Sequence, residues 1–429
     1  MTDTSMTDKN RLIEQLNDCD GAKRLAALTA LAGAGGVRAP GAPYYVNNHI
    51  HTTYSFSPYS PTKAVYMAAQ AGLETAGIMD HDAIAGAAEF IRAGRIAGLP
   101  TTVGVETRVD FSGTPFAGRL INNPDQAGVA YMALHGIPHG AFGAVDKVFS
   151  RVREARNVRN RAMTKRAAAF LRPAGVGLDF DRDVLPHSNY AEGGSVTERT
   201  ICFAIACNII EKTGRGAACV RLVSEALGLS VGGTAEARLL DAENVHYAYD
   251  LTGVLKGGMV KDFYLDAAEE LLSVDRFIGL GREVGAIAAY AYLGDVGDSV
   301  TGDKKAQKFE DGYLEELFGF LRDKGVDAIA YMPSRNSGGQ LKRLRGACAD
   351  FGFFEISGED INSSRQSFIC PQLAAPEFAH LIPATWALLG HEAAATNERA
   401  AGMFSQETIR QIPDLPGRIA HFERLGRGK

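Results

Sequence analysis

The sequence lacks the features that mark exported, disulfide-stabilised and membrane-spanning proteins. Its six cysteines include no C-x-x-C pair, and a chain of 429 residues can bury a large core without disulfides. The first residues, MTDTSMTDKNRLIEQL, are acidic where a signal peptide needs a basic stretch and then an apolar one. Apolar windows such as 201–210 are far shorter than the ~20 residues that span a bilayer. We therefore expect a soluble cytoplasmic protein without a membrane partner.

The sequence also has little to attract nucleic acid or a nucleotide cofactor. The net charge is −5, so the whole chain offers no general attraction to a polyanion. No Walker-type loop and no G-x-G-x-x-G loop follows an expected strand. The basic run from Lys147 to Arg172 is not interleaved with aromatic residues, which favours a solvated or phosphate-facing helix. Nucleic acid is an unlikely partner on this pattern, and the oligomeric state is not indicated.

What the sequence does have is an alternation of strand and helix patterns on both sides of a helical stretch. YYVNNHIH, TAGIMDHD and TTVGVETRVDF are expected strands separated by helical patterns, and the alternation returns after Gly281. Such alternation predicts an α/β fold with a parallel sheet. We divide the chain into a helical N-terminal extension at 1–43, an α/β unit at 44–140 and 281–372, a mainly helical insertion at 141–280, and a helical C-terminal extension at 373–429 that packs outside the sheet.

Metal-binding residue types follow three successive expected strands. His49 and His51 end the first strand, where a period of two places both side chains on the same side. By itself an H-x-H pair is equally compatible with structural hydrogen bonds. However, Asp80-His81-Asp82 follows the second strand and Glu106 ends the third. Because the carboxyl ends of parallel strands open on one face, these groups are expected to converge on a cation.

These segments resemble the polymerase and histidinol phosphatase (PHP) domain family of metal-dependent phosphoesterases. NNHIHTTYS, GIMDHDAIAG and VGVET are similar to its first three motifs, ALHGIP around His135 to its next, and the segment 326–362 to its closing strands. The resemblance implies a distorted (β/α)7 barrel with one to three manganese, iron or zinc ions around a phosphate. The ligands that it implies, which would also be the catalytic set, are His49, His51, His81, Glu106, His135 and Asp360, with Glu106 bridging two ions.

Several positions depart from the family pattern. Phe56 and Ser57 stand where an aspartate is usual, Tyr290 replaces a histidine, and Asn362 replaces the last histidine of the closing motif, where its carbonyl oxygen could still bind metal. In the helical insertion only Arg199 of an expected arginine-x-histidine pair is present. The departures suggest fewer than three ions, and a changed or absent activity.

The expected chemistry is hydrolysis by a metal-activated water. Asp80 or Asp82 would orient a ligand imidazole, with Tyr290 nearby. Arg199 and Arg335 are candidate phosphate contacts, as is the loop with Lys304, Lys305 and Lys308. His139, His187 and His246 are interpreted as structural. The leading hypothesis is a phosphoesterase for a small phosphorylated metabolite or nucleotide. The alternatives are a degenerate PHP barrel that binds a ligand or regulates without turnover, and a metal-dependent amidohydrolase.

Overall fold

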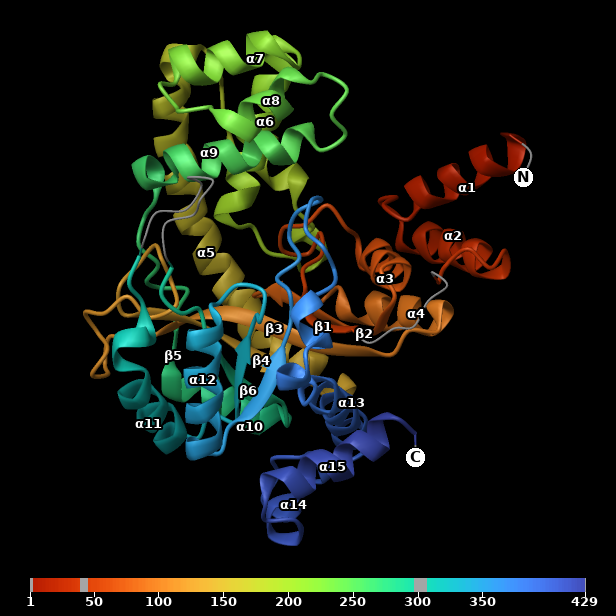
Figure 1. The fold of residues 1–429 in the computed structure, drawn as a ribbon. Coiled ribbons are helices and arrows are strands. Elements are labelled where there is room, and N and C mark those ends of the chain that lie inside the picture. Colours follow the sequence, from red (N-terminus) through yellow and green to blue (C-terminus); the bar gives the residue numbers. More distant parts are fainter. Residues whose placement is uncertain (1–2, 39–44, 297–306, 429) are drawn as a thin grey trace.

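The computed structural model describes residues 3–38, 45–296 and 307–428. One mixed sheet of eight strands forms the centre of the fold (Figure 1), and β5 pairs with β3 beside the path β1-β2-β3-β4-β6-β7-β8. Beyond the two edge strands, the His51 amide donates to the Ile361 carbonyl and the Ile361 amide to the His49 carbonyl, at 3.0 and 3.1 Å. These bonds nearly close the sheet into a barrel, so the expected distorted barrel is confirmed. The strands are β1 (Tyr45–Ile50), β2 (Leu73–His81), β3 (Thr101–Asp110), β4 (Val129–His135), β5 (Leu272–Ser273), β6 (Ile287–Ala291), β7 (Ala328–Tyr331) and β8 (Phe354–Ser357).

The sheet is not parallel throughout. Strand β4 runs antiparallel to both β3 and β6, whereas the remaining pairs are parallel. The antiparallel ladder also extends β3 past Glu106, because Asp110 pairs with Val129. The expectation that Glu106 ends its strand was therefore wrong: Glu106 lies four residues before the end of β3.

Helices pack around the barrel, as the strand–helix alternation predicts. Helix α3 begins at Pro61 with the Ser60 hydroxyl accepting from the Lys63 amide at 3.0 Å, and α4 ends at Gly98 in the left-handed region. The outer helices are α3 (Pro61–Gln70), α4 (Ala87–Ala97), α10 (Val274–Val284), α11 (Leu314–Lys324) and α12 (Gly338–Phe351). The short β5 and the first seven residues of α10 fall inside the range 141–280 expected for the insertion, yet residues of α10 belong to the barrel core.

The helical insertion has its own core and lies at one end of the barrel, at the top of Figure 1. Its apolar side chains, among them Ile205, Leu251 and Phe263, form a cluster separate from the barrel core. The first helix, α5, has 30 residues and contributes side chains both to the barrel core and to the core of the insertion. The helices are α5 (Phe142–Leu171), α6 (Glu198–Thr213), α7 (Ala217–Arg221), α8 (Gly233–Leu240) and α9 (Tyr247–Phe263).

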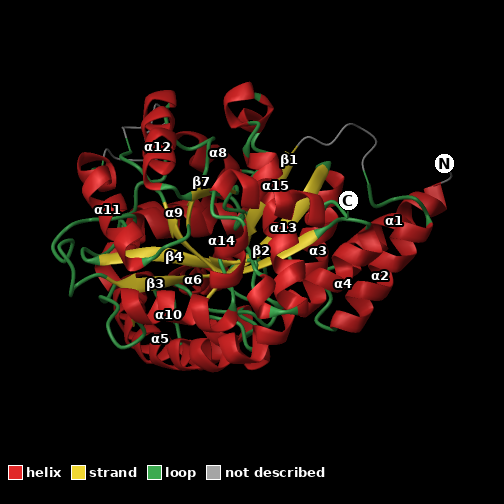
Figure 2. Cartoon of the chain, turned by 90° about the horizontal axis from the view of Figure 1, so that it is seen from below, coloured by secondary structure: helices red, strands yellow, loops and turns green. Residues whose placement is uncertain are grey.

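The two terminal extensions pack differently. Helices α1 (Asp3–Gln15) and α2 (Gly21–Gly33) lie against α3 and α4, where Arg24 forms a buried ion pair with Glu89. Helices α13 (Leu381–Asn397), α14 (Gln406–Gln411) and α15 (Leu415–Gly426) cover the end of the barrel opposite the insertion (Figures 1 and 2). Within the described ranges, no helix has the length and apolar character needed to cross a membrane.

Helix α13 reaches the inner face of the sheet. Its Ala387 and Leu388 belong to one buried cluster with Ala330 of β7 and Ile356 of β8. Ala330 and Ile356 also line the central pocket, so this face of the strands is the inward one. The expectation that the C-terminal extension lies wholly outside the barrel was therefore wrong, because alternate strand residues present apolar side chains to α13.

Candidate metal centre

Three histidines surround one carboxylate oxygen on the inner side of the barrel. The Oε2 atom of Glu106 lies 3.5 Å from His49 Nε2, 3.9 Å from His51 Nε2 and 3.2 Å from His81 Nδ1. One ligand atom from each of His49, His51 and Glu106 lies within 4.8 Å of the others, the arrangement needed to hold an ion. The structure thus brings together side chains from β1, β2 and β3, as their positions along successive strands predict.

A local irregularity of β1 helps to orient its two histidines. Asn47 pairs with Ala76 and Ile50 with Ile78, so three steps along β1 match two steps along β2. The extra residue is typical of a bulge, which re-aims side chains next to functional sites. Both imidazoles face Glu106, with ring centroids 5.0 Å apart. The alternation of side chains along a strand predicted that both histidines lie on the same side, but it did not predict this register shift.

The imidazole of His51 is fixed through Ser55. The carboxylate of Asp80 accepts from the Ser55 hydroxyl at 2.6 Å, and from the amide and hydroxyl of Thr52 at 2.7 and 2.6 Å. Because the Ser55 proton points to Asp80, its oxygen is free to accept from His51 Nδ1 at 3.2 Å. The Nε2 atom then carries the lone pair of the ring. Asp80 therefore acts on a candidate ligand through Ser55, not by direct contact.

The lone pair of His51 faces other acceptors. Its Nε2 atom lies 3.1 Å from Asp360 Oδ1 and 3.9 Å from Glu106 Oε2. With Nδ1 as the proton-bearing atom, these atoms repel one another unless a proton or a cation lies between them. With metal–ligand bonds of about 2.1 Å and angles of roughly 90–110°, ligand atoms lie about 3.0–3.4 Å apart. The separations in the cluster, 3.1 to 3.5 Å for its closest pairs, therefore fit a bound divalent ion.

The protonation states at neutral pH also suit an ion. Burial opposes ionisation of Glu106, yet the imidazoles of His49, His81 and His51 hold its pKa at about 2. Burial lowers the pKa of His81 to about 3 and that of His135 to about 3. Neutral His81 and His135 and an ionised Glu106 are the forms that coordinate metals. Burial opposes protonation of His49, yet Glu106 raises its pKa, so an ion that binds there would displace any proton that His49 holds.

The remaining expected ligands lie at the edge of this cluster. His135 of β4 pairs with Gly104 of β3, and Gly104 lies two residues before Glu106. The buried Nε2 atom of His135 has no hydrogen-bond partner in the described part of the chain. Asp360 follows β8, and the amide nitrogen of Asn362 donates to its Oδ1 atom at 2.6 Å. The carbonyl oxygen of Asn362 is buried without a partner among the same residues. Both His135 and Asn362 line the pocket described below.

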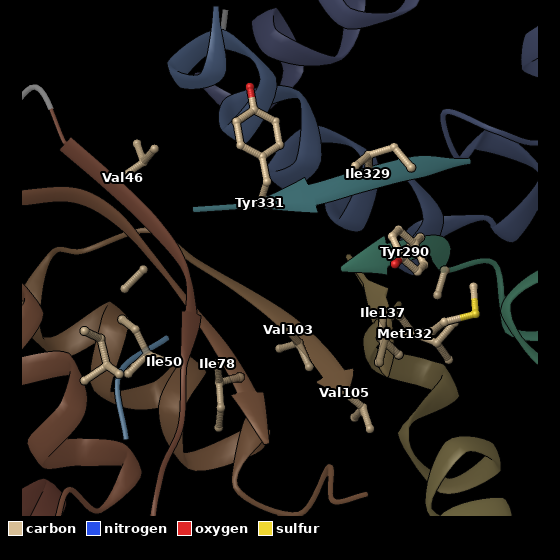
Figure 3. Packing of buried hydrophobic residues seen from close by; sticks show 14 of the residues in the cluster. Val46, Ile50, Ile78, Val103, Val105, Met132, Ile137, Tyr290, Ile329 and Tyr331 are labelled. Carbon is tan, nitrogen blue, oxygen red and sulfur yellow. The ribbon is translucent and has the colours of Figure 1, made fainter. Parts of the chain in front are cut away.

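Two residues expected near the ligands are directed elsewhere. Tyr290 packs in the core beside Met132 (Figure 3), and its hydroxyl donates to Glu310 Oε1 at 3.1 Å. Successive side chains of a strand point to opposite faces of the sheet. Because Ala291 of β6 lines the pocket, its neighbour Tyr290 points away from the pocket. Asp82 touches no imidazole: its carboxylate accepts from Thr107 and from Arg156. The expected roles of Tyr290 and Asp82 beside a ligand imidazole are thus corrected.

A pocket of about 460 Å³ opens above the cluster. Arg199 of α6, Lys256 of α9 and Arg335 after β7 line it, and in the described ranges none of their side chains has a hydrogen-bond or ion-pair partner. Of the other expected phosphate contacts, Lys304 and Lys305 lie outside the described residues. Lys308 is 91% exposed and pairs with Asp295 at 2.9 Å.

Several residues of the site were missed from the sequence. Ser55 ends the motif NNHIHTTYS but was given no role, because its hydrogen bond to Asp80 joins residues that are distant in the chain. Lys256 lies in no motif. The basic run was interpreted as a solvated or phosphate-facing helix, yet Arg153, Arg156 and Arg159 are more than nine-tenths buried. Their spacing of three residues places them on one face of α5, a signal that could have identified them. The solvated interpretation was wrong for these three arginines because each has a buried acceptor.

Comparisons with known proteins agree on the fold. The model of a family described as the PHP domain matches residues 47–180. A structure from Bifidobacterium adolescentis, assigned by inference as a metal-dependent phosphoesterase, has a TM-score of 0.52 and 18% identity, covering 80% of this chain and 96% of that one. An amidohydrolase from Chromobacterium violaceum, with bound sulfate and no metal, has a TM-score of 0.51 and 19% identity, covering 79% and 96%. No curated protein matches the sequence.

Proposed function

Because the chain carries a PHP domain at residues 47–180, we propose that it is a metal-dependent hydrolase that cleaves phosphate esters of a small metabolite or nucleotide. The observation that carries the proposal is the lone pair of His51 facing Asp360 and Glu106, a repulsive arrangement that a bound cation would relieve. A bound divalent ion would supply hydroxide near neutral pH and polarise a phosphoryl oxygen.

The residues of the chain have distinct parts in this proposal. His49, His51, His81 and Glu106 hold the ion, and His135 and Asp360 complete its surroundings or bind further ions. Ser55 and Asp80 keep the His51 proton on Nδ1, so that Nε2 stays available. Asn362 holds Asp360 through its amide group.

The cations of the pocket favour an anionic substrate. Arg199, Lys256 and Arg335 face the same cavity and form no ion pair among the residues described here, although Asp125 and Asp360 also line it. The proximity of Arg199 together with burial lowers the pKa of Lys256 to about 8. Positive side chains that lie close together repel one another, and a bound anion relieves this repulsion. Phosphate oxygens match arginine side chains in two-point contacts. This feature supports a phosphoester over an uncharged amide as the substrate of this chain.

The experiment is elemental analysis of purified protein from metal-supplemented expression, followed by phosphate release from a panel of phosphomonoesters and diesters. We expect at least one manganese, iron or zinc ion per chain and release of phosphate from part of the panel. His81→Ala should lose metal and activity while it stays folded. His421→Ala, on α15 at the opposite end of the barrel, serves as the matched control and should keep both. Less than one ion per wild-type chain would contradict the proposal.

Two alternatives give different results in the same experiment. Release of an amine without phosphate would identify an amidohydrolase. Bound metal and tight binding of phosphorylated ligands without any turnover would identify a degenerate barrel, which the replacements Phe56, Tyr290 and Asn362 favour.

A further inference from the structure

A buried ionic network connects the candidate metal centre with the helical insertion. Asp82 directly follows the candidate ligand His81, and Thr107 and Arg108 directly follow Glu106. The Asp82 carboxylate accepts from the Thr107 hydroxyl at 2.6 Å and from Nη1 of Arg156. The network therefore begins one residue away from two of the ligands.

The network continues into the insertion through Arg156. Its Nη2 atom donates to Glu198 at 3.1 Å, while its Nη1 atom contacts Asp82. Glu198 is the first residue of α6, and it also accepts from Arg108 at 3.0 Å and from Arg159 at 2.8 Å. Glu198 precedes Arg199, which lines the pocket. One guanidinium group thus bridges the end of β2 and the start of α6.

The charges of the network balance, and every member is more than nine-tenths buried. Three arginines, Arg108, Arg156 and Arg159, meet three carboxylates, Asp82, Glu198 and Glu270. A buried charge without its partner is strongly unfavourable, so these side chains hold one arrangement. Paired guanidinium contacts restrict orientation more than a single ammonium contact does.

The backbone at Asp82 gives independent evidence of a constrained position. Its φ angle is +52°, in the left-handed region, and among the described residues it is the one non-glycine residue with a positive φ. Such a conformation persists where surrounding contacts impose it, often beside functional sites. Here the carbonyl oxygen of Asp82 accepts from Arg153 at 2.8 Å, and its carboxylate is held by Thr107 and Arg156.

We propose that Thr107 and Arg156 are positioning residues that act through Asp82 to set His81 and Glu106 for the ion, so that docking of the helical insertion determines the metal affinity of the barrel. This inference rests on the proposed function, because it assumes that His81 and Glu106 bind a divalent ion. It predicts that contacts outside the ligand set change the affinity for the metal ion, and that this change is measurable without substrate.

The first test compares two threonines on β3. Thr107→Val removes the hydroxyl bound to Asp82 and keeps the shape of the side chain. Thr102→Val is the matched control, because the Thr102 hydroxyl is equally buried and donates to a buried carboxylate, Glu392, at 2.6 Å, but at the other end of the strand. In titrations of metal-free protein with Mn²⁺ or Zn²⁺, we expect Thr107→Val to bind about tenfold more weakly than wild type. Thr102→Val should bind like wild type.

The second test compares two arginines on α5. Arg156→Lys keeps the charge but cannot bridge Asp82 and Glu198. Arg159→Lys disturbs the same Glu198 without touching Asp82. Both variants should lose some stability in denaturant unfolding, whereas only Arg156→Lys should lose metal affinity.

The outcomes separate this inference from the proposed function. Wild-type affinity in both Thr107→Val and Arg156→Lys would overturn the positioning role and leave the metal site intact. Equal losses in each variant and its control would also overturn it, since the effect would then follow general stability. A wild-type chain that binds neither ion would refute the proposed function itself, and the inference with it.

Discussion

Ser55 has a larger part in the candidate site than its residue type suggests. Its oxygen accepts a hydrogen bond from His51 Nδ1 and its hydroxyl donates one to Asp80, so these two hydrogen bonds determine which nitrogen of the ring faces Glu106. Burial raises the pKa of Asp80, while the donors Thr52 and Ser55 and the nearby His51 stabilise its charged form. Partners of this kind orient a ligand and increase its basicity.

We therefore expect Ser55→Ala to weaken Zn²⁺ or Mn²⁺ binding by roughly tenfold, because the His51 ring loses the acceptor that orients it. The measurement is a competition titration against a chelator. Ser57→Ala is the control, since the Ser57 hydroxyl accepts from the Tyr59 amide in the same loop and contacts no candidate ligand. The same affinity in both variants would contradict the part assigned to Ser55.

At the scale of elements, two glycines allow α13 and α15 to cross closely. A Cβ atom on Gly390 would lie 1.9 Å from the Phe422 carbonyl oxygen, and one on Gly426 would lie 2.0 Å from that of Trp386. These contacts are with backbone, which cannot move aside as a flexible side chain can. The crossing holds α15 against α13, and α13 in turn packs on the inner face of β7 and β8.

Gly390→Ala should therefore destabilise the protein by about 1–3 kcal/mol, the usual cost of overpacking. Denaturant unfolding measures the difference. Gly279→Ala is the control, because Gly279 lies inside helix α10 and a Cβ atom there would meet nothing within 4 Å. That variant should be more stable than wild type by about 0.5–1 kcal/mol, from the lower entropy of its unfolded chain. A tolerated Gly390→Ala would show that the helices can separate at little cost.

At the scale of the whole molecule, buried neutral histidines make stability depend on pH. His391 of α13 is 2% exposed, and burial lowers its pKa from 6.5 to about 4. As pH falls below 6.5 the unfolded chain takes up this proton before the folded chain does. The contribution of His391 to stability is therefore complete above pH 6.5 and is lost as pH falls toward 4.

We expect the free energy of unfolding of wild type to fall over that window, with His391 accounting for a loss of the order of 3 kcal/mol. His391→Gln cannot titrate there, so its stability should fall less steeply between pH 6.5 and 4. Above pH 7 the two proteins should show similar slopes. Parallel curves over the whole range would show that His391 is already protonated in the native state, or that the fold opens around it.

The barrel and the residue types at its centre follow from the pattern of the sequence alone. Ligand residue types on successive strands predict convergence because parallel strands place corresponding ends at one edge, and His49, His51, His81 and Glu106 do meet. Glu106 pairs with His81 although β3 continues four residues further. The other features of the site depend on contacts between distant parts of the chain. The bridge from Asp82 through Arg156 to Glu198 joins residues 74 and 42 positions apart, which no local pattern encodes. The face of the sheet on which Tyr290 lies depends on the register of β6, because a shift of one residue moves every side chain of a strand to the opposite face.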